Sequence, residues 1–120
     1  MGNLERGDLQ RTIVDAAVAA ETYIRTTVEE GLPTDLDASL RKYINDANIR
    51  QLVEKFFPER LYTEQANTYK KTLKSNMHKL FDDRNDIMHS GEKVGLTASY
   101  CEKLVSSVRE LVSLEPRTAT

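Results

Sequence analysis

Apolar residues recur at intervals of three and four along nearly the whole chain, which is the spacing of one face of an α-helix. Over residues 9–30 the stripe consists of Leu9, Ile13, Ala16, Ala17, Ala20, Tyr23, Ile24 and Val28. Similar stripes run over residues 63–89 and 97–114. Two shorter stripes lie between residues 34 and 57, and we expect Asn45-Asp46-Ala47-Asn48 to separate their two short helices. No segment reads as a β-strand. The sequence therefore predicts an all-α fold, a single bundle of four to five helices.

Glycine and proline mark the ends of these helices. Gly31 and Pro33 end the first one, and Pro58 ends the helical stretch before it because the residue before proline avoids helical geometry. Gly91 stands where a helix often needs a left-handed residue. Five Gly and three Pro are too few for the many turns of an all-β fold. We expect one domain over residues 1–120, with residues 1–7 and 116–120 as frayed ends.

The bulk properties favour a cytoplasmic protein. The single cysteine, Cys101, cannot form an internal disulfide and suits a reducing compartment. No stretch approaches the roughly 18 apolar residues of a membrane span, and no signal-peptide pattern opens the chain. The net charge of −2 is unlike that of proteins that bind nucleic acid non-specifically. Contact with RNA would therefore need a local site or an assembled groove.

The segment FDDRNDIMHSG, residues 81–91, contains the two side chains best suited to a phosphate, Arg84 and His89. Arg84 falls on the apolar stripe of the helix predicted over residues 63–89. A structural role is open to both residues, since an arginine can pair with a core carboxylate and a histidine is stabilised near a helix C-terminus. Five residues turn through about 500°, so the two side chains point about 140° apart on a straight helix. Sharing one phosphate requires either a break in the helix or two chains that each contribute a pair.

The run Arg84-Asn85-Asp86-Ile87-Met88-His89 resembles the R-x4-6-H signature of the HEPN superfamily (higher eukaryote and prokaryote nucleotide-binding domains). An asparagine after the arginine and small residues after the histidine, here Ser90 and Gly91, are common in that family. Its fold is also a bundle of four to five helices, with the motif towards the end of a long helix ahead of the last one. The resemblance implies a metal-independent endoribonuclease, often a toxin or a phage-defence protein, that forms a homodimer in which two motifs make one cleft. It does not imply control by adenylylation, because toxins regulated in that way carry tyrosine where this chain has Gly91.

In such a cleft the ribose 2′-OH of the RNA is the nucleophile, and the resemblance gives the catalytic roles to Arg84 and His89. His89 would act as general base, and His89 of the second chain as general acid, since histidine titrates near neutral pH. Arg84 would hold the non-bridging phosphate oxygens. Asn85 would support His89 by orienting it, because the two are four residues apart on one helical face. No cofactor is expected.

A set of basic residues precedes the motif on the same predicted helix. Lys70, Lys71, Lys74 and His78 are possible RNA-binding residues that would lead a phosphate backbone towards His89, although charged helix faces are more often simply solvated. No metal site is expected, since the chain has no His-Glu-x-x-His, Glu-x-x-His or Cys-x-x-Cys pattern.

Two other interpretations compete with the nuclease. The chain can be a non-catalytic HEPN-like dimerisation module within a larger complex, with an antitoxin or another protein as partner. It can also be a generic helical interaction protein in which the motif is accidental. Oligomeric state separates the generic interaction protein from the other two interpretations, which both expect a dimer. RNA cleavage separates the nuclease from the non-catalytic module.

Overall fold

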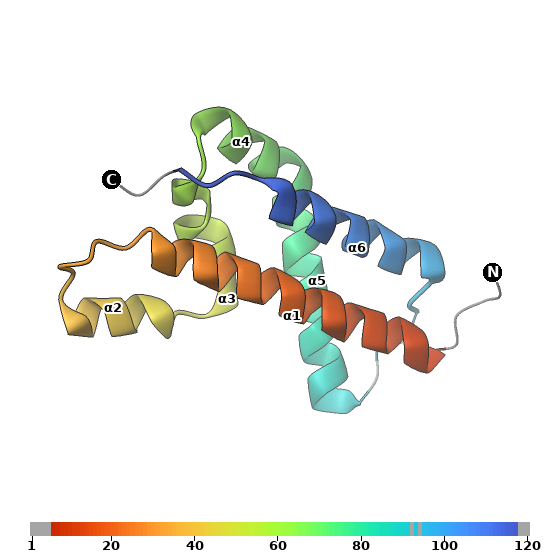
Figure 1. Cartoon of the computed structure of the whole chain (residues 1–120). Helices are drawn as coiled ribbons and strands as arrows, with labels where there is room; N and C mark the ends of the chain where they lie inside the picture. The colour runs from red at the N-terminus through yellow and green to blue at the C-terminus, as the bar shows by residue number, and fades with distance from the viewer. Residues whose placement is uncertain (1–5, 92, 94, 118–120) are drawn as a thin grey trace.

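The computed structural model describes residues 6–91, 93 and 95–117, and this part of the chain is an all-α bundle (Figure 1). Three long helices form its centre: α1 (Arg6–Glu30), α5 (Lys74–Ser90) and α6 (Ala98–Ser113). Helices α1 and α6 run side by side, and α5 crosses behind them (Figure 1). The predicted fold class is therefore confirmed.

Shorter helical segments connect α1 to α5. They are α2 (Ala38–Asn45), α3 (Ile49–Gln51), a π-helical turn (Leu52–Phe56), a 3-10 turn (Pro58–Arg60) and α4 (Thr63–Thr68). The predicted break between α2 and α3 is present, because the Asn48 side chain accepts a hydrogen bond from the Gln51 backbone N–H and so begins a new helix.

The core lies where α1, α5 and α6 meet. Its fully buried side chains include Ile13, Ala17, Ile24, Met77, Leu80, Leu104 and Leu111. Phe57 and Tyr69 pack against each other with their ring centroids 5.1 Å apart, and the buried Tyr69 hydroxyl donates a hydrogen bond to the Val53 carbonyl. Cys101 is buried, which fits a small packing residue. The spacing of apolar residues at intervals of three and four thus predicted most of the buried face of the long helices.

The helix predicted over residues 63–89 is not uniform. A π-helical turn at Tyr69–Leu73 separates α4 from α5, and such a turn contains more residues than an α-helical one. Lys70 and Lys71 lie within this turn, so they do not keep the 3.6-residue register that relates them to His89. Beyond the turn, α5 continues without interruption to Ser90. Gly91 then adopts the left-handed conformation expected of it, with φ of 82°.

The ends of the described chain are partly ordered by contacts. Helix α1 begins at Arg6, and at the other end the Arg117 N–H donates to the Arg60 carbonyl at 2.6 Å. Leu61 and Pro116 form an isolated β-bridge. The remaining residues that we predict as frayed, 1–5 and 118–120, lie outside the described residues. Among the described residues, no helix is long and apolar enough to cross a membrane.

Candidate functional site

The two motif residues lie on α5, whose last turns extend past α1 (Figure 1). Arg84 faces α1, and its guanidinium Nη1 donates to Glu21 Oε1 at 2.5 Å. The guanidinium also lies 5.3 Å from the centre of the Phe81 ring, a cation–π contact. Only 20% of the Arg84 side chain is exposed. Arg84 therefore pairs with a carboxylate in the way that the structural interpretation of the motif requires.

Glu21 binds two arginines at once. Its Oε2 accepts a hydrogen bond from Arg25 Nε at 2.7 Å, while Oε1 accepts from Arg84. Partial burial raises the pKa of Glu21, but the hydrogen bonds and positive charges of Arg84 and Arg25 outweigh burial and leave the pKa below its ordinary value. The charged form of Glu21 is thus favoured by the fold. Neither Asp82 nor Asp83, the two acidic residues next to Arg84, forms an ion pair with it.

His89 is in a different environment, one residue before the end of α5. The side chain is exposed and makes no hydrogen bond or ion pair with the part of the chain that the structure describes. Asn85 is exposed as well, and within the described residues no hydrogen bond joins it to His89. Met88, beside His89, is 70% exposed. The end of α5 therefore presents a free imidazole on an uncovered surface.

The continuity of α5 decides how Arg84 and His89 are related. Because the helix does not break between them, their side chains point about 140° apart and their Cα atoms are separated by about 7.5 Å along the axis. Of the two arrangements compatible with a shared phosphate, a broken helix is excluded. One chain alone does not direct both side chains to one phosphate.

The predicted RNA-binding residues divide into two groups. Lys74 Nζ lies 3.3 Å from Glu54 Oε2, and His78 Nε2 lies 2.6 Å from Glu54 Oε1. The His78 hydrogen bond is the main cause that lowers the pKa of Glu54. Lys70 and Lys71 are exposed and precede α5, where Lys74 is already about 22 Å from His89 at 1.5 Å of rise per residue. The structure therefore does not bring these four residues together as one basic path to His89.

One buried carboxylate near the motif was not predicted from the sequence. Asp83 is buried, accepts a hydrogen bond from the Tyr100 hydroxyl at 2.5 Å, and lies 3.4 Å from Lys93 Nζ. Lys93 also binds Asp86 at 2.6 Å. Burial, followed by the contact with Asp83, raises the pKa of Tyr100. These bonds tie the start of α6 and the connection before it to the end of α5.

The signal for Asp83 was its spacing. Asp83 lies three residues after Leu80 and four before Ile87, and all three are buried. The buried stripe of α5 thus runs through Asp83 and Ile87. The prediction that Arg84 falls on the apolar stripe is wrong at this end of the helix. Arg84 lies at the edge of the buried face, and Met88, four residues later, is exposed.

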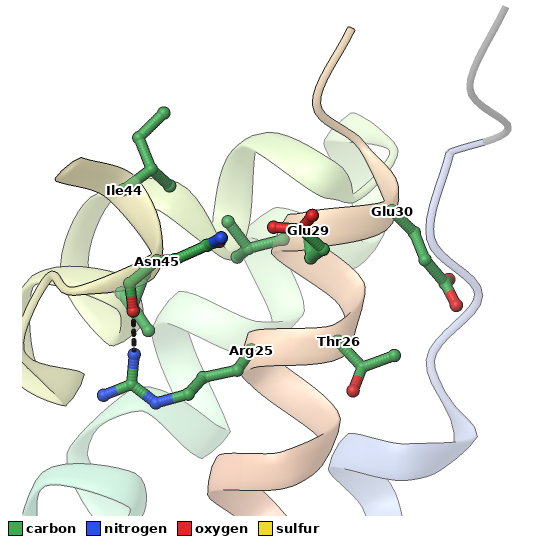
Figure 2. Close-up of a pocket in the computed structure, with 8 residues that line it drawn as sticks. Arg25, Thr26, Glu29, Glu30, Ile44 and Asn45 are labelled. Carbon is green, nitrogen blue, oxygen red and sulfur yellow. Dashed lines mark hydrogen bonds between the residues drawn. The ribbon is translucent and has the colours of Figure 1, made fainter. Parts of the chain in front are cut away.

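A pocket of about 320 Å³ lies apart from the motif, between the end of α1 and α2 (Figure 2). Its labelled lining includes Arg25, Glu29, Ile44 and Asn45. The polar groups there serve the fold: Arg25 Nη1 donates to the Asn45 carbonyl at 3.1 Å, and Glu29 Oε1 accepts from Arg41 at 2.9 Å. These bonds hold α2, which has no buried residue, against α1.

Comparison with protein-family models, with curated proteins and with solved structures finds no match to this chain. Within the described residues, no group of three or more His, Cys, Asp or Glu side chains is arranged to hold a metal ion.

Proposed function

We propose that this chain is a HEPN-type, metal-independent endoribonuclease whose active site forms between two copies of the chain, as in toxin and phage-defence proteins. The observation that carries the proposal is the contrast along α5. A free, exposed His89 lies five residues after an oriented Arg84 on an unbroken helix. Arg84 and His89 can act on one phosphate only when α5 of a second copy contributes its own Arg84 and His89 to the same site.

The reaction needs no metal, because RNA contains its own nucleophile. His89 of one copy removes the proton of the ribose 2′-OH, whose oxygen forms a bond to the adjacent phosphorus. The bond from phosphorus to the 5′-oxygen breaks, and His89 of the other copy protonates that oxygen. The products are a 2′,3′-cyclic phosphate and a free 5′-OH.

Arg84 stabilises the negative charge that develops on the phosphate oxygens. A guanidinium has five N–H donors, of which the described contacts with Glu21 use Nη1. Donors therefore remain for a phosphate while Glu21 fixes the orientation of the side chain. Glu21 acts through Arg84 and is a positioning residue.

Uncovered apolar side chains beside the ion pair support the dimer. Val18, three residues before Glu21 on α1, is 55% exposed, and Met88 follows Arg84 by four residues on α5. Both fit a surface that a second copy would cover, in keeping with the depletion of charge at the centre of protein interfaces.

A second candidate is a non-catalytic HEPN-like assembly module. The Arg84–Glu21 ion pair favours it, because an arginine that is held by a carboxylate already has a structural role. The exposed Leu40 and Tyr43 on α2 also offer a place for a partner protein. In this case the chain would contribute a dimer or a docking surface to a larger complex, for example with an antitoxin.

The deciding experiment is RNA cleavage in EDTA by the wild-type chain beside His89→Ala and Arg84→Ala. Arg109→Ala is the matched control, since Arg109 is an exposed arginine on α6. Circular dichroism establishes that each variant is folded. The nuclease predicts cleavage by the wild type and the control and its loss in both motif variants. A stable dimer that leaves a broad panel of RNAs intact supports the assembly module instead.

A further inference from the structure

A second pocket, of about 210 Å³, opens between α3 and α5. Its lining consists of Asn48, Ile49, Arg50, His78, Phe81, Asp82 and Asn85. Pockets that enclose drug-sized ligands usually measure about 300–1,000 Å³. This one is smaller, and its size suits a single ring system.

The pocket lies on the His89 side of α5. Positions 78, 82, 85 and 89 follow one another at intervals of four, three and four, so they fall within about 40° of one line along the helix. Arg84, by contrast, points about 140° away from His89. Asn85 is about 6 Å and Asp82 about 10 Å from His89 along the axis. The pocket is therefore one nucleotide away from a phosphate held at His89.

The charges of the pocket are balanced. Arg50 Nη2 lies 3.3 and 3.5 Å from the two carboxylate oxygens of Asp82, and both side chains are about 60% exposed. His78 is paired with Glu54. A site for a phosphate would carry an excess of positive charge. A neutral site with a planar guanidinium fits an uncharged, planar group better.

Unpaired bases of RNA have the properties that match this lining. They stack on arginine guanidinium planes, and side chains with donors and acceptors bind their edges. Asn85 has both kinds of group and is not bonded to other described residues, while the Asp82 carboxylate only accepts.

We infer that this pocket binds the nucleobase of the nucleotide next to the cleaved phosphate in single-stranded RNA, with Arg50 stacking on the base and Asp82 and Asn85 binding its edge. This inference rests on the proposed function. Asp82 favours bases with an exocyclic amino group. Uracil is disfavoured, because its one N–H is flanked by two carbonyl oxygens that repel a carboxylate.

The test measures binding of labelled RNA hexamers by fluorescence anisotropy, in a His89→Ala background that prevents cleavage. The ligands are oligo(A), oligo(U) and an abasic ribose-phosphate strand of the same length. We expect Arg50→Ala to weaken oligo(A) binding about 5- to 150-fold, the range for stacking of one base, and to leave the abasic strand unchanged. We expect Asp82→Asn to reduce the preference for oligo(A) over oligo(U). Arg109→Ala is the control for loss of one positive charge.

Three results would overturn the inference: no measurable RNA binding, equal oligo(A) binding by Arg50→Ala and Arg109→Ala, or an equal loss of abasic-strand binding in Arg50→Ala. The last would mean that Arg50 binds a phosphate. The same experiments distinguish a failure of the proposed nuclease from a failure of the pocket. Base-dependent binding through Arg50 without cleavage by the chain that retains His89 removes the nuclease and keeps the pocket. Cleavage that is indifferent to Arg50 and Asp82 removes the pocket and keeps the nuclease.

Discussion

Two regions of α5 that lie only five residues apart contrast sharply. At the crossing with α1, Arg84 is held by Glu21 and lies over the Phe81 ring. At the end of the helix, His89 is exposed and has no bonded partner in the described chain. The first region has the contacts of a structural element, whereas in the second no contact among the described residues explains a histidine. The contacts of the fold therefore account for Arg84, whereas those among the described residues do not account for His89.

The largest expected effect is the loss of RNA cleavage on substitution of His89 at the end of α5. We expect His89→Ala to lower RNA cleavage by about 10²- to 10⁴-fold, the usual contribution of general acid–base catalysis. The free energy of unfolding should change by less than about 0.5 kcal/mol, because the side chain is exposed. Cleavage assays in EDTA and urea denaturation measure the two quantities. A clear loss of stability would remove the contrast between the regions.

At the crossing with α1, unlike at His89, we expect a substitution to lower the stability of the fold. We expect Arg84→Ala to lower the free energy of unfolding by about 1–3 kcal/mol, because it removes a charged hydrogen bond and a cation–π contact. A double-mutant cycle with Glu21→Ala isolates the pair, and Arg109→Ala is the exposed control. No coupling between positions 84 and 21 would mean that Arg84 is as free as His89.

A third substitution tests whether the buried Asp83 fixes the last turns of α5 against α6. Tyr100→Phe removes the hydroxyl that donates to the buried Asp83 and leaves Lys93 as its described partner. We expect a loss of about 1 kcal/mol, as for one hydrogen bond to a buried group. Amide hydrogen exchange should rise near the end of α5 and at the start of α6. Unchanged exchange there would show that Asp83 does not fix this end.

The smallest expected effect is the pH dependence of the stability that the Glu21–Arg84 ion pair contributes. The pKa of Glu21 is lower in the folded chain than its ordinary value near 4.5, so its stabilising contribution is present above that value and is lost as pH falls through the folded pKa. Glu21→Gln should therefore be less stable than the wild type at pH 7, with a difference that narrows below about pH 4.5. Thermal unfolding between pH 3 and 7 measures this. A difference that is constant with pH would contradict the ion pair.

The sequence predicted the fold because each long helix carries its own apolar period, and that signal is local. It also predicted the break before α3, from the polar run Asn45-Asp46-Ala47-Asn48, and the structure adds that Asn48 caps the new helix. It did not reveal the π-helical turn at Tyr69–Leu73, which depends on packing and not on a distinctive residue. The register of Lys70 and Lys71 with the motif was lost for that reason.

The site was predictable only in part. The spacing of Arg84 and His89 gave their divergence, but the partner of Arg84 lies 63 residues away on α1, and no local pattern indicates it. The role of Asp83 was hidden because a single carboxylate among apolar residues becomes recognisable only when Tyr100 and Lys93 are seen beside it. Contacts between helices, rather than the helices themselves, are what the sequence leaves open.

One chain does not direct Arg84 and His89 to one phosphate, and we therefore propose that cleavage requires two copies. The most direct test measures RNA cleavage per chain in EDTA across a dilution series, with the dimer fraction determined by analytical ultracentrifugation under the same conditions. If the active site forms between two copies, activity per chain follows the dimer fraction and disappears with it. Constant activity per chain in a monomer would contradict a site shared by two copies.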